Sequence, residues 1–254
     1  MTAPDPVLFT IFGIDIMWYG ALIGTGFLIA IGISYYRAPQ YGIDRDFILT
    51  LTIGIIPAAL IGARLYYVIF SWENYSGNIS KIFDVRSGGL AIHGGLILSF
   101  IVGYLLCKKY KVNFLTAADL VAPVIALAQS IGRWGNFFNE EAHGGPTDLP
   151  WAQIIDGVGY HPTFLYESIW CLLLFIFLMY ISKHRQKFKG QIICLYGILY
   201  SAERFFVEGL RTDSLMIGPL RQAQVISLFI IAACVLIYII LKQKSESLNK
   251  GEIQ

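Results

Sequence analysis

Seven long apolar segments run through the chain and leave few folds open to it. Each is long enough to cross about 30 Å of hydrocarbon, which takes roughly 17 to 25 helical residues. The segments lie near residues 17–36, 47–70, 88–107, 114–131, 162–181, 191–209 and 222–241. The fourth is the weakest, because it is short and contains Asp119 and Pro123. We therefore expect an all-α polytopic membrane protein with seven transmembrane helices, built as one domain over residues 1–254 with a short cytoplasmic tail from about residue 242.

The composition agrees with residence in a bilayer. Charged residues make up 14% of the chain, against roughly 25% in a soluble domain. The net charge of +2 gives no reason to expect a nucleic-acid partner. The four cysteines lie in or at the ends of apolar segments without CxxC spacing, so we interpret them as small apolar residues. No positive charge precedes the first apolar segment, so we expect that helix to be retained and not cleaved as a signal peptide.

Basic residues indicate how the chain is oriented. Lysine and arginine are concentrated after the first, third, fifth and seventh apolar segments, for example at Lys108, Lys109, Lys183 and Lys187. Cytoplasmic segments of membrane proteins carry such an excess. The pattern predicts an outer amino terminus, a cytoplasmic carboxyl terminus and two long outer-side loops, at residues 71–87 and 132–161.

Small residues recur at helical spacing in the first two segments. They are Gly20 and Gly24 in the first, and Gly54, Ala58 and Gly62 in the second. Residues of this size let neighbouring membrane helices approach closely. We interpret them as packing positions.

With this orientation, polar residues of six segments fall at one level, in the outer half of the membrane. Singly, each has a structural explanation, such as a hydrogen-bonded histidine or an arginine paired with glutamate. Together they predict a polar cavity that faces the outer leaflet, because ionisable groups at membrane depth are costly and usually functional. The excess of arginine suggests an anionic lipid headgroup as the ligand. The residues are Tyr19, Arg64, His93, the block from Arg133 to Gly144, His161, Tyr200, Glu203, Arg204, Glu208 and Arg211.

The block that follows the fourth segment carries the densest set of polar groups. It reads Gly-Arg-x-Gly-Asn-Phe-x-Asn-x-Glu-x-x-Gly from Gly132 to Gly144. Five further blocks accompany it, at residues 18–20, 62–64, 91–95, 161–167 and 203–211. In sequence and order, these blocks resemble the bacterial prolipoprotein diacylglyceryl transferases, over about residues 14 to 240.

This resemblance implies an activity, the first step of bacterial lipoprotein maturation. The diacylglyceryl group of phosphatidylglycerol would be transferred to the thiol of the lipobox cysteine in a prolipoprotein signal peptide, forming a thioether and releasing glycerol phosphate. The expected location is the plasma (inner) membrane, with the active site toward the outer leaflet. The predicted cavity agrees with this, since the donor lipid is anionic and the acceptor is inserted in the membrane.

The chemistry assigns roles to the predicted site residues. A thiol with a pKa near 8.5 must become a thiolate, and charge that grows on the phosphate must be stabilised. His93 is our candidate base, and Arg133 and Arg204 are candidate phosphate clamps. An alternative is that Arg204 activates the cysteine and His93 is only structural. The predicted substrate-binding residues are Tyr19, Arg64, Asn136, Asn139, Glu141, Gly144, His161, Tyr200, Glu203, Glu208 and Arg211.

Within that set, Asn136, Asn139 and Tyr19 are expected to orient headgroup oxygens. Glu141, Glu203 and Glu208 are expected to hold the arginines and to balance their charge. The sequence contains neither a metal-ligand constellation nor a nucleotide-binding loop, so no cofactor is expected.

Other functions fit the sequence less well. A transporter or flippase of an anionic phospholipid would also need an arginine-lined cavity, but repeated halves and polar residues in the inner half would be expected as well. An intramembrane protease would need a Ser-His or Asp-Asp pair within the apolar segments, and we find none. Two arginines inside these segments argue against a passive scaffold.

Overall fold

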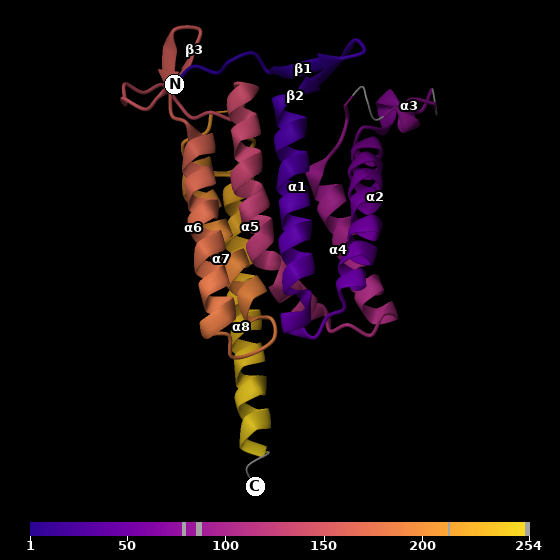
Figure 1. The fold of residues 1–254 in the computed structure, drawn as a ribbon. Helices are drawn as coiled ribbons and strands as arrows, with labels where there is room; N and C mark the ends of the chain where they lie inside the picture. The colour runs from indigo at the N-terminus through magenta and orange to yellow at the C-terminus, as the bar shows by residue number, and fades with distance from the viewer. Residues whose placement is uncertain (78–79, 85–87, 213, 252–254) are drawn as a thin grey trace. The chain divides into compact units, whose positions relative to one another are not determined.

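The structure is a computed structural model that describes residues 1–77, 80–84, 88–212 and 214–251, and within them it is mostly helical (Figure 1). One long helix stands at each of the seven predicted segments. Their bounds are α1 Trp18–Arg37, α2 Arg45–Phe70, α4 Ile92–Lys109, α5 Phe114–Phe138, α6 Thr163–His184, α7 Gln191–Glu208 and α8 Gln222–Gly251.

Six helices of the described residues are long and apolar enough to cross a membrane, namely all of the long ones except α7. Helix α7 differs because three of its 18 residues are charged: Glu203, Arg204 and Glu208. The structure therefore supports a helical multi-pass membrane protein. A seventh span at α7 remains a prediction.

Both of the long loops that the sequence predicts, at residues 71–87 and 132–161, differ from the prediction. Helix α5 does not end at residue 131 but continues to Phe138, so the first half of the polar block, residues 132–138, is helical. The other loop contains the 3₁₀ helix η2 Trp72–Asn74 and the short helix α3 Ser80–Phe83, while residues 78–79 and 85–87 lie outside the described residues.

A further 3₁₀ helix, η1 Ala38–Tyr41, follows α1. At the carboxyl end, α8 extends as a helix through the polar tail that begins at Lys242.

Three antiparallel hairpins were not predicted. They are β1 Val7–Ile11 with β2 Ile14–Met17, β3 Gln153–Ile155 with β4 Val158–Tyr160, and β5 Met216–Ile217 with β6 Leu220–Arg221. The first two have two-residue turns in which both residues have positive φ, at 49° and 77° in Phe12-Gly13 and at 49° and 80° in Asp156-Gly157. This is the turn geometry that matches the twist of paired strands.

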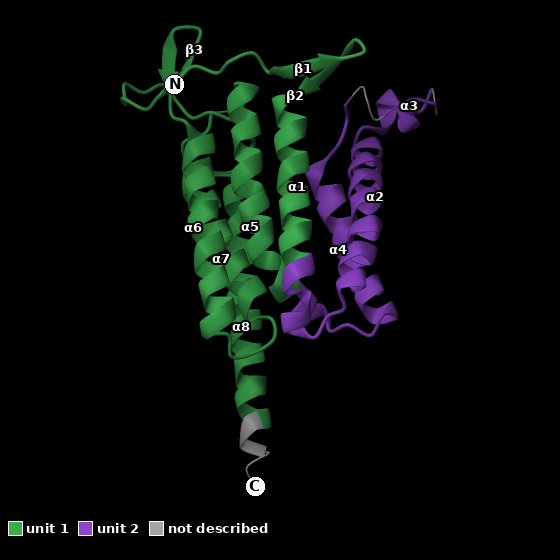
Figure 2. Ribbon diagram, viewed as in Figure 1, with its two compact units in different colours: residues 1–34, 118–254 green, residues 35–117 purple. Residues whose placement is uncertain are grey.

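The chain forms two compact units, shown in Figure 2. Unit 1 contains residues Met1–Ser34 and Ala118–Gln254, and unit 2 contains Tyr35–Ala117. The division falls inside α1 and α5. The single domain expected from the sequence stays a prediction, and each unit is described by itself.

Unit 1 is built around contacts among α5, α6 and α7. Its buried core joins Ala122 and Ala126 of α5, Leu174 and Leu178 of α6, and Ile192 of α7. Helix α1 approaches α5 closely at Gly26, where an added Cβ would lie 3.2 Å from the backbone oxygen of Ala128. A Cβ added to Gly20 or Gly24 would meet no described atom of a neighbouring helix within 4 Å, so the packing role predicted for these two glycines was wrong.

Asp119 explains why a carboxylate is present in the apolar part of α5. It is fully buried and accepts hydrogen bonds from Gln186 Nε2 at 2.7 Å, from the backbone N–H of Gly190 at 2.6 Å and from that of Ile193 at 2.9 Å. Two of these donors belong to the start of α7, where backbone N–H groups have no helical partner. Asp119 thus fixes the turn between α6 and α7.

We expect Asp119→Ala to destabilise unit 1 without changing any side chain of the predicted site. Each buried donor left without a partner costs about 1–3 kcal/mol. A loss of this size lowers the thermal unfolding midpoint by about 5 °C or more in a domain of this length. Thermal unfolding in detergent measures the shift, and Asp46→Ala, at an exposed position of α2, is the matched control. Equal midpoints for the two variants would contradict the capping role.

Unit 2 is a close pair of helices, α2 and α4. A Cβ added to Gly62 would clash with the backbone oxygen of Gly94, and one added to Gly94 would clash with that of Gly62. The same pair of helices meets at Gly54, where an added Cβ would lie 2.6 Å from Leu106. The packing role predicted for Gly54 and Gly62 is therefore confirmed.

Candidate functional site

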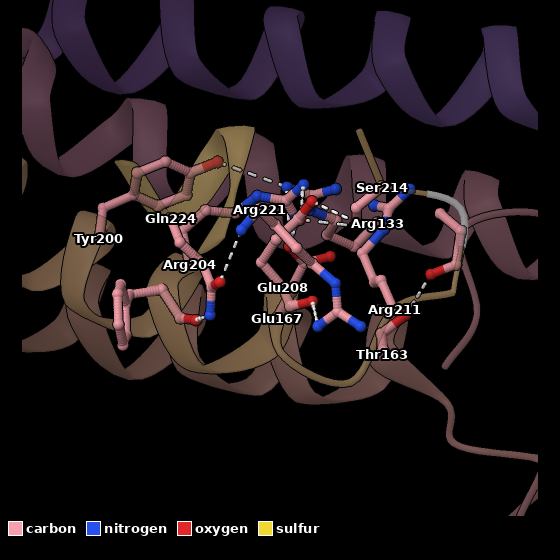
Figure 3. Close-up of polar contacts among 12 residues, drawn as sticks. Arg133, Thr163, Glu167, Tyr200, Arg204, Glu208, Arg211, Ser214, Arg221 and Gln224 are labelled. Atoms are coloured by element: carbon pink, nitrogen blue, oxygen red, sulfur yellow. Dashed lines mark hydrogen bonds and ion pairs between the residues drawn. The ribbon is translucent and has the colours of Figure 1, made fainter. Parts of the chain in front are cut away.

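A row of arginine and glutamate side chains joins α5, α6 and α7 in unit 1 (Figure 3). Arg133 Nη2 lies 3.1 Å from Glu167 Oε1, and Arg204 Nη1 lies 2.6 Å from the same oxygen. Arg204 Nη2 lies 2.6 Å from Glu208 Oε2, which is also 4.0 Å from Arg211 Nε. We call these five residues the arginine–glutamate row.

The glutamates of the row are more deeply buried than its arginines. The exposed fraction is 1% for the side chain of Glu167 and 6% for that of Glu208, against 20% for Arg133 and Arg204. The cationic groups are therefore the accessible part of the row. A buried carboxylate next to partly exposed guanidinium groups can hold them in place and leave their outer edges for an anion.

The segment between α7 and α8 supports the end of the row. Ser214 Oγ donates to Glu208 Oε1 at 2.6 Å, and Arg221 Nη1 donates to the backbone oxygen of Glu208 at 2.6 Å. Gln224 Nε2 donates to the backbone oxygen of Phe205 at 3.1 Å. These contacts, visible in Figure 3, fix the last turn of α7. Among the described residues, four arginines lie here, counting Arg221, together with the three glutamates Glu167, Glu203 and Glu208.

Arg133 has hydrogen-bonding capacity to spare. Its Nη2 makes both contacts of the side chain, with Glu167 and with the hydroxyl of Tyr200 at 3.4 Å. Neither Nη1 nor Nε has a partner among the described residues. An arginine edge with free donors can bond two oxygens of one phosphate group.

A second polar group lies at the end of α5. Glu141 Oε1 accepts hydrogen bonds from Asn136 Nδ2 at 2.8 Å and from Asn139 Nδ2 at 3.4 Å. Tyr19 lies against the same turn, where a Cβ on Gly135 would come within 2.5 Å of its ring. A pocket of about 580 Å³ is lined by Asn139 and Glu141, and a pocket of about 480 Å³ by Tyr19 and Asn139. The polar block thus borders open space with hydrogen-bonding side chains.

Gly144 and His161 hold the connection after α5 against the end of α7. The backbone N–H of Gly144 donates to the oxygen of His161 at 2.9 Å, and that of Gly145 donates to the oxygen of Leu210 at 3.0 Å. A Cβ on Gly144 would lie 2.7 Å from the Cβ of His161. His161 Nδ1 lies 3.3 Å from the hydroxyl of Tyr166. The structure therefore gives both residues close-packing roles next to Arg211.

Two predicted site residues, His93 and Arg64, belong to unit 2. His93 is exposed in the first turn of α4, its ring centroid lies 6.2 Å from that of Tyr66, and the described residues offer its ring nitrogens no hydrogen bond. Arg64 is 5% exposed and directs its guanidinium to backbone carbonyl groups. One side chain is accessible, whereas the other is buried and engaged.

The structure corrects the expected partners of the arginines. Glu141 contacts asparagines, and neither carboxylate oxygen of Glu203 has a hydrogen-bond partner among the described residues. Glu208 pairs with arginine as expected, but the central partner is Glu167, to which sequence reasoning gave no role. A signal existed: Glu167 is the single carboxylate of α6, and a carboxylate within an apolar helix needs a partner.

Among the described residues, no group of three or more histidine, cysteine, aspartate or glutamate side chains could hold a metal ion. The arginine–glutamate row and the polar block present guanidinium, amide, carboxylate and phenol groups. Such a set can bind anions and hydroxyl groups.

Known proteins can be aligned with this chain over nearly its whole length. The family model described as prolipoprotein diacylglyceryl transferase matches residues 6–240. A phosphatidylglycerol--prolipoprotein diacylglyceryl transferase from Finegoldia magna is 52% identical over 248 residues, covering 98% of this chain and 99% of the relative. The enzyme of the same name from Clostridioides difficile is 52% identical over 243 residues, covering 96% and 98%. The row, the polar block and His93 all lie inside the matched region, and the chain belongs to the prolipoprotein diacylglyceryl transferase family.

Proposed function

We propose that the arginine–glutamate row is the phosphate-binding part of a phosphatidylglycerol–prolipoprotein diacylglyceryl transferase. The chain transfers the diacylglyceryl group of phosphatidylglycerol to a prolipoprotein, in lipoprotein maturation. One observation carries the assignment of the row. Arg133 and Arg204 meet at a single oxygen of Glu167, so both guanidinium groups lie within reach of one phosphate group.

The reaction sets two demands on the site. The thiolate sulfur of the lipobox cysteine attacks the glycerol carbon that carries the phosphate ester. The new S–C bond replaces the C–O bond, and the phosphate leaves with the bonding electrons as glycerol phosphate. A proton must first leave the thiol, because the thiolate is the nucleophile. Negative charge then increases on the departing phosphate and requires fixed donors.

In our proposal, residues of the chain remove the thiol proton and stabilise the charge on the phosphate. His93 takes the thiol proton, since its residue is exposed and its ring nitrogens have no hydrogen-bond partner among the described residues. Arg133 and Arg204 bind the phosphate, and Glu167 orients both arginines. Asn139 and Tyr19 border the pockets at the end of α5, and Asn136 donates a hydrogen bond to Glu141, which lines one of them. In the proposal, all three residues orient the headgroup. The alternative, in which Arg204 activates the cysteine, remains distinguishable by experiment.

The membrane placement follows from the same proposal. All seven long helices span the bacterial plasma membrane, with the amino terminus outside, the carboxyl terminus in the cytoplasm and the row toward the outer leaflet. Two of the three charged residues of α7, Arg204 and Glu208, are compatible with a span, because they pair with each other and Arg204 also pairs with Glu167.

Cysteine labelling tests this orientation. In whole cells, a membrane-impermeant thiol reagent should label Gly77→Cys and Asp148→Cys but not Lys187→Cys, all three at exposed positions. The native cysteines are buried or half-buried, so background labelling should be low. Lysed cells should give labelling at all three positions, which shows that Lys187→Cys is reactive. Labelling of Lys187→Cys in intact cells, together with protection of Asp148→Cys, would reverse the topology.

The activity is tested with the purified protein, phosphatidylglycerol vesicles and a lipobox peptide. Mass spectrometry should show a peptide heavier by one diacylglyceryl group, and glycerol phosphate should appear in equal amount. A peptide with serine in place of the cysteine is the control for the acceptor, and phosphatidylcholine vesicles are the control for the donor. Movement of phosphatidylglycerol between leaflets without peptide modification would favour a flippase.

A further inference from the structure

Arg64 uses every donor of its guanidinium on the backbone of its own unit. Nε donates to the oxygen of Ile82 at 2.8 Å. Nη1 donates to the oxygens of Gly88 at 2.7 Å and Gly89 at 2.9 Å, and Nη2 donates to those of Lys81 at 2.5 Å and Asp84 at 2.8 Å. A guanidinium has five N–H donors, so none remains for a phosphate. Arg133 differs, because its Nη1 and Nε have no partner among the described residues.

These five carbonyl groups come from two places in the chain. Lys81 and Ile82 belong to α3 and Asp84 follows it directly, at a helix end that leaves carbonyl groups without partners. The other two belong to Gly88 and Gly89, which have φ values of 90° and 73° and stand shortly before α4. A Cβ on Gly89 would lie 2.6 Å from Arg64 Nη1, so both the backbone conformation and the approach of the arginine favour glycine here. Arg64 thereby joins α2 to the two segments that precede α4.

The contact with α2 continues into the first turn of α4. The backbone N–H of Ala91 donates to the oxygen of Ala63 at 3.0 Å, one residue before Arg64. Gly94 then packs against Gly62, with no room for a side chain on either. His93 lies between these two fixed points, so its backbone position is set by α2 from both sides.

We propose that Arg64 is a positioning residue for His93 and not a ligand of the lipid phosphate. This inference rests on the proposed function, in which His93 takes the thiol proton. The arginine holds Gly88 and Gly89 at the entrance to α4, and the glycine contact holds the turn that follows. The buried guanidinium is itself stabilised, because its charge is shared among five carbonyl dipoles and the ring of Tyr75, which lies 5.2 Å away.

The test compares Arg64→Gln, His93→Gln and the double variant in the transfer assay, each in full-length protein. Displacing a catalytic group by about 1 Å costs on the order of 10²-fold in rate, so Arg64→Gln should lower kcat by about that factor. KM for phosphatidylglycerol should stay within roughly twofold, because no phosphate contact is lost. Arg64→Gln should add little, less than about threefold, to the defect of His93→Gln. Arg45→Gln, at an exposed arginine of the same unit, is the matched control.

Several outcomes would overturn the proposal. A KM that rises with kcat unchanged would make Arg64 a lipid ligand. A full Arg64→Gln defect in the His93→Gln background would show that the two residues act separately. If Arg64→Gln does not fold, Arg64→Lys keeps the charge and up to three donors, and it should show the same kcat defect in weaker form. Failure of the proposed function itself looks different, since the unmodified protein would then transfer no diacylglyceryl group.

Discussion

Arg133→Lys is expected to reduce diacylglyceryl transfer by about 10²- to 10³-fold, the usual cost of losing a donor that stabilises transition-state charge. The lysine keeps the positive charge but has a single nitrogen in place of a planar fork. In the structure, Arg133 reaches Glu167 and Tyr200 through one nitrogen and has two further nitrogens without described partners. A lysine ammonium at this position cannot keep both contacts and still present two parallel donors to a phosphate.

Two measurements together distinguish weaker binding of the phosphate from a loss of folding. Purified Arg133→Lys should have the thermal midpoint of the unmodified protein within a few degrees, while its kcat/KM falls. Arg185→Lys, an exposed arginine at the end of α6, is the control for the substitution itself and should retain full activity. Near-normal transfer by Arg133→Lys in a folded protein would remove Arg133 from the phosphate site.

The positions of the long helices could be predicted from hydropathy because lipid imposes a minimum apolar length on each span. Even the weak fourth segment was predicted correctly. Its Asp119 does not face lipid but accepts hydrogen bonds from the start of α7. Hydropathy indicates which side chains are compatible with lipid. It cannot show that Asp119 has hydrogen-bond partners inside the protein, which only the fold reveals.

The ends of the helices could not be predicted in the same way. Helix α5 continues to Phe138 because hydrogen bonding of the backbone does not stop where apolar composition stops. Two glycines of this block lie against α1: an added Cβ would lie 2.5 Å from the ring of Tyr19 at Gly135, where no side chain fits, and 3.0 Å from the end of the Ile23 side chain at Gly132. Glycine in this block serves helix packing between α1 and α5.

The site residues were predicted as a set, but their pairing was not. Counting along the segments placed charged groups at one depth, and unit 1 does bring Arg133, Arg204, Glu208 and Arg211 into one row. Depth alone does not reveal which carboxylate faces which arginine, since this depends on the rotation of each helix about its axis. Glu167 was missed for that reason, and Arg64 was grouped with the substrate-binding residues although its donors bind backbone carbonyl groups.

His93→Gln is expected to give a large defect that depends on pH. Glutamine retains a polar side chain at this exposed position of α4 but cannot take up the thiol proton. Removal of a general base typically costs 10² to 10⁴ in rate. The loss should shrink as the pH rises toward the pKa of the acceptor thiol, about 8.5, because the cysteine then supplies its own thiolate and the base becomes dispensable. Transfer rates measured from pH 6 to 9 with a saturating lipobox peptide would show this recovery.

The pH profile also decides between the two ways of activating the cysteine. If Arg204 activates the thiol and His93 only supports the fold, the defect of His93→Gln should be nearly the same at every pH. Arg204→Gln should be inactive throughout in either case, because Arg204 also joins Glu167 to Glu208 in the row and its loss disturbs both contacts. The discriminating result is therefore how the activity loss of His93→Gln changes with pH, and not the size of that loss at one pH. A small loss that does not change with pH would show that His93 is not the base. It would then also contradict the proposed positioning role of Arg64, which acts through His93. The proposed phosphate site of unit 1 would be unaffected.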